Sequence, residues 1–405
     1  MNIVKKLIII SALFFLLISC EKRKSTDIAR SELFALQYGK LENQIDLFQV
    51  SGRLANRNSG VFMRDGLFYV TDGNSGKIME FTSYGDLIFL LYNSKNNPRP
   101  SLLNTDTDKG EKVTKRAVVY DFIKPGKTIV SSFNDIYVVD RVENDRMIQD
   151  KKRGVILSNI VLHFDKSGNI VNFLGQEGSG GTPFPYIESL FITKYDQPVV
   201  ITRIPNRWEI FWFKANGDIM YHRILSISSF NGIEKNGQSI DIEKIIPDRV
   251  KNYLYVSISV YKDIVDPATK VKSTIKRVEG RIYVFDMKEA KFIKYITIPD
   301  DKPVKEGNQV IPLPSYELFG VTEDGFFYLL RYENINKSRL LILNKNGEII
   351  TEKTIVTDDS SLIYRYLSMD DKGIIYGLLA NEKNARIVWW RTDKIISRYK
   401  AANNE

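Results

Sequence analysis

The stretch Leu67–Leu91 reads LFYVTDGNSGKIMEFTSYGDLIFLL and describes a small antiparallel sheet. An apolar strand is followed by a turn, a second strand, a tight glycine turn and a third strand. Similar stretches begin at Asp135, Pro198, Tyr253, Gly325 and Gly373. Small sheets repeated about every 50 to 80 residues are typical of a β-propeller, whose blades bury their faces on one another. The repeat therefore predicts an all-β fold with six blades.

The hairpin between the last two strands carries glycine at the same place in four of the six copies: Gly85, Gly168, Gly217 and Gly347. Each of these glycines is followed by Asp, Asn or Glu and then by Leu or Ile. Glycine adopts a positive φ without steric cost, as this kind of turn requires. The fourth copy has residues 288–290 there and the sixth has residues 392–394, so the motif decays in those two. We expect the four glycines in equivalent outer hairpins.

The first twenty residues have the outline of a signal peptide. Lys5 and Lys6 precede an apolar run from Leu7 to Ile18, which has twelve residues, whereas a membrane-spanning helix needs about 20. Residues 17–20 (Leu, Ile, Ser, Cys) resemble a lipobox, with Cys20 as the lipidated residue. The alternatives are an ordinary cleaved signal peptide and an uncleaved anchor. The prediction is a signal peptide over 1–19, a lipid anchor and linker over 20–45, and a propeller over 46–400.

Composition narrows the class of protein. The chain has 405 residues, of which 43% are hydrophobic and 12% aromatic, as expected for a globular, strand-rich protein. The net charge of +9 is dispersed over polar stretches, and an exported chain is not expected to bind nucleic acid. Cys20 is the single cysteine, so a lipidated chain has no thiol left for a disulfide, a nucleophile or a zinc site.

The first repeat, with YVTDGNSGKIMEFTSYGDLI, is similar to an NHL-type propeller blade. The whole chain, including LFALQYGKLENQIDLF from Leu33 to Phe48, also resembles uncharacterised propeller lipoproteins of spirochaetes. These resemblances imply a six-bladed, NHL-like propeller behind a lipid anchor. The alternative fold is an eight-bladed scaffold of the outer-membrane assembly type, for which the chain has too few blades.

The sequence offers few residues for catalysis. His163 and His222 are the two histidines, and both lie in predicted strands beside aromatic residues, where a structural role is expected. The HExxH, GxSxG and P-loop motifs are absent from the sequence. Residues 175–181 (GQEGSGG) look superficially like a phosphate loop, but an X-Pro run follows them instead of a helix. We interpret that stretch as a loop between blades.

A calcium-dependent hydrolase is the alternative function. Some six-bladed propellers are lactonases that bind calcium through carboxylates in the central channel, and the candidates here are Asp72, Asp140 and Asp324. Residues 106–111 also look faintly like a calcium loop, although their glycine is out of register. Acidic residues at strand ends commonly cap turns instead. No catalytic, cofactor-binding or metal-ligating residue is therefore assigned.

The leading hypothesis is a non-catalytic lipoprotein that binds or scaffolds other proteins of the bacterial envelope. It would be held in a membrane by acyl chains, palmitate among them, on Cys20, and would face the periplasm rather than the cell surface. Loops on a rigid scaffold often carry the binding function. The long insertions at Asn93–Lys115 and Asp263–Lys276 are the contact regions that we expect, with an envelope protein as partner and no cofactor.

Overall fold

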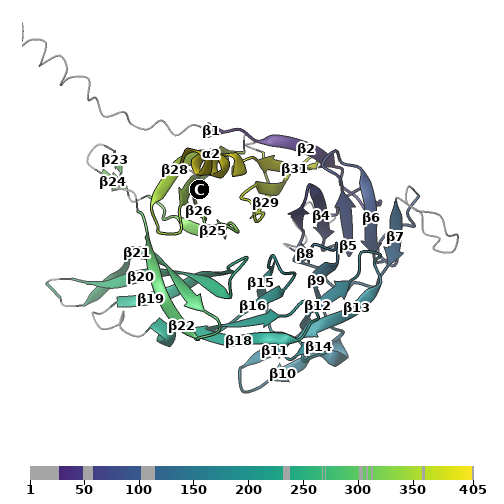
Figure 1. The fold of residues 1–405 in the computed structure, drawn as a ribbon, viewed down its shortest axis with the longest axis horizontal. Helices are drawn as coiled ribbons and strands as arrows, with labels where there is room; N and C mark the ends of the chain where they lie inside the picture. Colours follow the sequence, from purple (N-terminus) through teal and green to yellow (C-terminus); the bar gives the residue numbers. More distant parts are fainter. Residues whose placement is uncertain are drawn as a thin grey trace, which may run out of the picture.

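The computed structural model describes residues 27–48, 58–101, 115–230, 238–266, 268–269, 271–300, 304–306, 309–311, 313–357 and 361–403. Six antiparallel sheets stand around a central axis like the blades of a propeller (Figure 1). The predicted all-β, six-bladed fold is confirmed in this part of the chain. In each repeat the innermost strand comes first in the sequence and lines the centre of the ring.

The first three blades follow one another along the chain. Blade 1 contains β3 (Gly60–Arg64), β4 (Leu67–Asp72), β5 (Lys77–Phe81), β6 (Leu87–Tyr92) and a parallel edge strand, β7 (Arg116–Val119). Blade 2 contains β8 (Thr128–Val130), β9 (Ile136–Arg141), β12 (Asn159–Phe164), β13 (Ile170–Gly175) and β14 (Gly178–Ser179). Blade 3 contains β15 (Ile187–Ile192), β16 (Pro198–Ile204), β17 (Arg207–Phe213) and β18 (Ile219–Ser226).

The last three blades complete the ring. Blade 4 contains β19 (Gln238–Pro247), β20 (Tyr253–Val265), β21 (Lys272–Asp286) and β22 (Lys291–Ile298). Blade 5 contains β25 (Glu317–Val321), β26 (Phe327–Asn334), β27 (Lys337–Leu343) and β28 (Ile349–Val356). Blade 6 contains β29 (Tyr364–Met369), β30 (Ile375–Ala380) and β31 (Ala385–Trp390) from its own repeat.

Smaller elements decorate this ring. The hairpin of β10 (Ile148–Asp150) and β11 (Val155–Leu157) is inserted in blade 2, and the hairpin of β23 (Val304–Glu306) and β24 (Gln309–Ile311) precedes blade 5. Two short 3-10 helices cover Asn144–Arg146 and Ile227–Phe230. Within the described residues, no helix is both long enough and apolar enough to cross a bilayer.

The hairpin glycines occupy the equivalent positions that the repeat predicts. Gly85, Gly168, Gly217 and Gly347 lie between the third and fourth strands of their blades, with φ of +87°, +84°, +88° and +87°. The N–H of Gly85 donates to the carbonyl of Thr82 at 3.0 Å, and the other three make the same bond to the residue three positions earlier. In the fourth blade Ala290 takes the positive φ, at +52°.

The same glycines allow neighbouring blades to approach closely. A Cβ added to Gly85 would lie 2.7 Å from the Cβ of Phe34, and one added to Gly347 would lie 2.5 Å from Cγ2 of Ile296. Such distances are too short for two carbon atoms, so a side chain here would push the blades apart. Each glycine thus serves both its own turn and the contact with the preceding blade.

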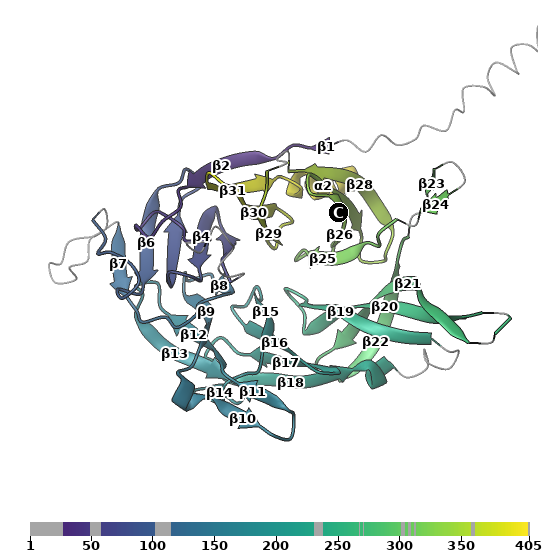
Figure 2. The ribbon, with the colours of Figure 1, turned by 180° about the vertical axis from the view of Figure 1, so that it is seen from behind.

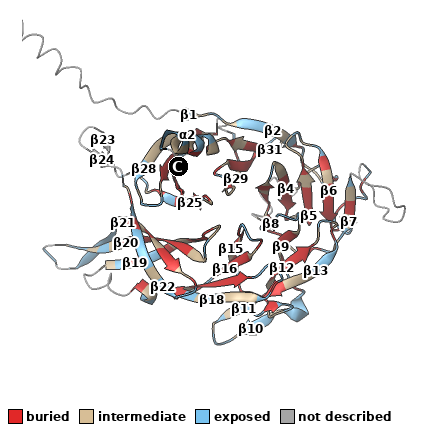
Figure 3. Ribbon diagram, viewed as in Figure 1, coloured by how far each residue is buried: buried red, intermediate tan, exposed pale blue. Residues whose placement is uncertain are grey.

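The hydrophobic core lies between the blades, because each blade buries both of its faces (Figure 3). On β4, Phe68 and Val70 pack in the cluster shared with blade 6, whereas Tyr69 between them packs in the cluster shared with blade 2. Successive side chains of a strand point to opposite faces, and here both faces are apolar. This explains why apolar and polar residues alternate poorly in the repeats.

The N-terminal segment differs from the expected linker over 20–45. Residues of β2 (Ser31–Leu36) pair antiparallel with β31 and supply the outer strand of blade 6, as seen from both sides of the ring (Figure 2). Before it, β1 (Asp27–Ile28) pairs in parallel with β28 of blade 5. The propeller therefore begins by Asp27 instead of residue 46, and blade 6 joins the N-terminal strand β2 to the last strand, β31, in one sheet.

The sixth repeat also ends differently from the expectation. Residues 392–394 do not form a hairpin, because helix α2 (Asp393–Asn403) begins there. Ile395, Ile396 and Tyr399 lie on one side of this helix and pack against blades 5 and 6. Apolar residues at this spacing suit a helix better than a strand. The place of the missing fourth strand is taken by β2.

Candidate functional site

Three cavities lie around the central axis of the ring. One cavity, of about 540 Å³, lies where β3, β8 and β15 begin; we name this side the start face. A middle cavity has about 180 Å³, and a third, of about 450 Å³, lies where the innermost strands end, at the end face. Phe62 of β3 lines all three cavities, so they adjoin one another at this residue.

The start-face cavity is bordered mainly by blades 1 and 2. Lys124, Lys127 and Arg141 of blade 2 bring positive charge to it, and Tyr186 and Tyr366 add aromatic rings. Met147 and Ile156 also line it, so the β10–β11 insertion lies at its edge. A cavity of several hundred Å³ with a few polar groups is typical of a site for a small molecule.

Two further cations line the middle cavity, and both reach across to a neighbouring blade. Nζ of Lys244 on β19 donates to the carbonyl of Phe319 in blade 5 at 2.9 Å. Nη1 of Arg249, which follows β19, donates to the carbonyl of Ile192 in blade 3 at 2.7 Å. Burial lowers the pKa of Lys244 to about 8 and also lowers the pKa of Arg249.

The end-face cavity has a mixed charge. Asp65, Asp370, Asp371 and Asp393 line it together with five cationic residues. Arg391 donates to both carboxylate oxygens of Asp393, at 2.9 and 2.7 Å. Burial raises the pKa of Asp370 to about 6, although its carboxylate accepts hydrogen bonds from the amides of its own turn. The carboxylate of Asp370 thus stabilises its own turn, and that of Asp393 forms an ion pair.

Asp72, a candidate calcium ligand, is a structural residue of blade 1. Its carboxylate lies 3.8 Å from Nζ of Lys77, and both side chains are fully buried. It also accepts the N–H of Asp46 at 2.8 Å, while Lys77 donates to the carbonyl of Leu41 at 2.7 Å. Burial raises the pKa of Asp72 and lowers the pKa of Lys77 to about 8. Through these hydrogen bonds the Asp72–Lys77 pair holds the loop over 41–46 against blade 1.

The other two candidate calcium ligands lie elsewhere in the ring. Asp140 on β9 accepts the backbone N–H groups of Ile123, Lys124 and Arg141 and so orders the loop before β8. Asp324 is in the turn between β25 and β26, at the end face, and its carboxylate pairs with Lys400 of α2. The structure does not bring Asp72, Asp140 and Asp324 together. Among the described residues, no group of three His, Cys, Asp or Glu could hold a metal ion.

Both histidines stack on an aromatic residue of the adjacent strand. The ring of His163 lies 4.2 Å from that of Tyr137 with an interplanar angle of 10°, and His222 lies 4.3 Å from Phe211 with an angle of 11°. Neither histidine lines a channel cavity. These contacts agree with the structural role that the sequence indicates.

The remaining candidate sites fall on loops or outside the described chain. Residues 175–181 connect β13 and β14 at the outer edge of blade 2 and lead into no helix. Cys20 and residues 106–111 lie outside the described residues. The channel cations were missed from the sequence, because Lys127, Lys244 and Arg249 stand in no motif that distinguishes them from surface residues.

Several solved propellers are similar to this chain. The Dos1 propeller is 9% identical over 89% of this chain and 94% of that one, with a TM-score of 0.38. The β-propeller domain of the trilobed protease from Pyrococcus furiosus is 12% identical over 83% and 96%, with a TM-score of 0.34. The polysaccharide lyase Uly1 is 8% identical over 91% and 99%, with a TM-score of 0.39. No protein-family model and no curated protein matches the chain.

Proposed function

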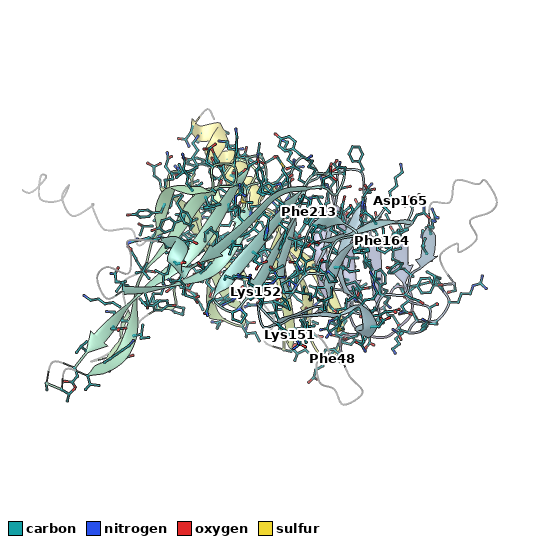
Figure 4. All side chains as sticks on the ribbon, turned by 90° about the horizontal axis from the view of Figure 1, so that it is seen from below. Phe48, Lys151, Lys152, Phe164, Asp165 and Phe213 are labelled. Carbon is teal, nitrogen blue, oxygen red and sulfur yellow. The ribbon has the colours of Figure 1, made fainter. Side chains whose placement is uncertain are left out.

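We propose that this protein is a lipid-anchored, non-catalytic protein of the bacterial envelope, whose propeller binds another envelope protein. The observation that carries the proposal is a hairpin of blade 4 that projects from the ring, which Figure 4 shows edge-on. We name the described residues of this hairpin between 263 and 279, which are 263–266, 268–269 and 271–279, the arm. It covers the insertion at Asp263–Lys276, which the sequence analysis selects as a contact region.

The arm extends past the strands that flank it in the blade. On one side β19 pairs with β20 only as far as Lys262, and on the other β22 pairs with β21 only as far as Gly280. Beyond these points β20 and β21 pair with each other alone, from Asp263↔Ile275 to Val265↔Lys272. The outer edge of β21 therefore has no neighbouring strand from Lys272 to Glu279 within the described structure.

The arm also exposes apolar side chains. Five are at least 40% accessible: Ile264, Val265, Val271, Ile275 and Val278. Clustered apolar residues on a projecting element mark a contact surface more often than a free one. An unpaired strand edge can also accept a strand from a partner, since its backbone N–H and C=O groups are available. Both features support protein binding through the arm.

The arm can be tested by site-specific crosslinking. A photoreactive residue at Val271 of the full chain should give one discrete adduct in intact cells, and one at the exposed Ile170 of blade 2 should not. Ile275→Asp should abolish the adduct, whereas the matched surface change Val171→Asp should leave it, with unchanged melting in both variants. Equal adducts from Val271 and Ile170, or none from Val271, would contradict the proposal.

The lipid anchor is the second part of the proposal and rests on the lipobox-like residues that end at Cys20. Cys20→Ala should move the protein from the detergent phase to the aqueous phase, because several acyl chains supply far more membrane affinity than one. Phase partitioning of the variant and the parent chain checks this. A variant that stays with the detergent would show that another part of the chain holds it there. The likeness to NHL-type blades and the periplasmic location remain predictions.

A further inference from the structure

The start-face and middle cavities adjoin each other, and all of their described charged lining residues are cationic. They share Phe62, Lys127, Thr128 and Tyr366, so a ligand in one would reach the other. Their combined lining includes five cationic side chains: Lys124, Lys127, Arg141, Lys244 and Arg249. No carboxylate is among their described lining residues. The end-face cavity, in contrast, contains four aspartates beside its cations.

The cations that line these two cavities have N–H groups that are not used in hydrogen bonds. Lys127 donates to the carbonyl of Ile187 at 3.3 Å, which uses one of its three N–H groups. Lys244 and Arg249 each donate to one carbonyl in the same way. Nε of Arg249 is buried and has no hydrogen-bond partner among the described atoms. A carbonyl fixes the position of each head group but leaves its charge unneutralised.

The nearest acids do not form ion pairs with these cations. Glu188 acts on the charge of Lys127 and Lys244, and Glu317 also acts on Lys244. Asp371 and Asp370 act on Arg249 in the same way. Within the described chain, no carboxylate oxygen lies within 4 Å of any of the five. Desolvated cations that lack a close anion cost free energy, which a bound anion would recover.

Aromatic rings accompany the charges. Lys127 lies over the ring of Tyr186, with Nζ 5.6 Å from its centroid, and Tyr186 is 60% exposed. Phe62, Phe191 and Phe319 line the middle cavity, and Tyr366 lines both. Flat apolar faces beside cationic donors suit a small organic molecule with a negative group better than a bare surface ion.

We infer that the start-face and middle cavities bind small molecules that carry a carboxylate or a phosphate group, with Lys127 at the centre of the site. Lys127 occupies this place because it lines both cavities. Lys124 and Arg141 attract the ligand at the opening, and Lys244 and Arg249 receive it in the middle cavity. This site is separate from the arm, so either can fail without the other.

Calorimetric titration of the full chain in detergent, at low salt, tests the inference. The probes are inorganic phosphate, glucose 6-phosphate and glucuronate, with glucose as the neutral match for the two sugars. At least one anionic probe should bind and glucose should not. Binding of glucose 6-phosphate alone would assign the site to phosphate, and binding of glucuronate alone to carboxylate. If glucose bound equally well, or if none of the three anions bound, the inference would be wrong.

Substitutions of single cations test where in the protein the anion binds. Lys127→Met should weaken binding by at least about tenfold, as expected for the loss of the cation that lines both cavities. Lys166→Met, on the exposed hairpin of blade 2, is the matched control and should bind like the parent chain. Arg141→Gln at the opening should weaken binding less and reduce its dependence on salt. Thermal melting of each variant verifies folding, and an unchanged affinity in a folded Lys127→Met would place the anion elsewhere.

Discussion

Lys77→Met is expected to destabilise the protein by about 3–5 kcal/mol, because it leaves the carboxylate of Asp72 buried without its cation. Both side chains are fully buried, and their atoms lie 3.8 Å apart. The substitution also removes the hydrogen bond from Lys77 to Leu41 in the loop over 41–46. That loop places Ile45 and Leu47 in the core between blades 1 and 6, so its release should add to the loss. Denaturant unfolding of parent and variant measures the change.

Two control variants distinguish the effect of burying an unpaired charge from the effect of losing an ion pair. Lys95→Met breaks a closer ion pair, at 2.8 Å from Asp121, but both side chains are mostly exposed, so the unfolding midpoint should hardly move. In the double variant Lys77→Met with Asp72→Leu, no unpaired carboxylate is left buried, so much of the stability should return. A Lys77→Met protein as stable as the parent would mean that the pair contributes nothing.

The blades could be predicted from the sequence because a few neighbouring residues specify each of their turns. Gly85, Gly168, Gly217 and Gly347 each specify a hairpin within a few residues, and the turn fixes the register of the two strands beside it. The same reasoning placed the structural histidines in strands. The expectation of a hairpin position at residues 392–394 was wrong. The apolar residues that follow this polar triplet have the spacing of a helix, and α2 begins there.

Long-range features could not be obtained in this way. The outer strand β2 has no hairpin partner near it in the sequence, and its partner β31 begins at Ala385. The candidate site shows the same limit. Asp72 and Asp140 stand at strand ends, as channel ligands might, but the loops that bury them come from residues 41–46 and 123–124. Lys127 belongs to blade 2, and Lys244 and Arg249 belong to blade 4. These cations therefore form a cluster only when the folded ring places both blades around one cavity.

The hairpin glycines allow the contact between blades to be measured apart from the turn. Gly347→Ala and Gly66→Ala both put a side chain at a similar positive φ, +87° and +82°. An added Cβ at Gly66 has no atom within 4 Å, whereas at Gly347 it meets Ile296 of blade 4 at 2.5 Å. The backbone conformation should cost each variant about 1–2 kcal/mol. Crowding of a packed contact adds about 1–3 kcal/mol, and only Gly347→Ala should show it.

The expected loss for Gly347→Ala is therefore about 2–5 kcal/mol in total, the larger part of it from the contact between blades 4 and 5. Denaturant unfolding of both variants gives the difference directly. In the variant Gly347→Ala with Ile296→Ala, the Cγ2 atom that the added Cβ would meet is gone, so the combined loss should be smaller than the sum of the two single losses. Equal losses in Gly66→Ala and Gly347→Ala would mean that the blades adjust freely, and that glycine is needed at position 347 for the turn alone.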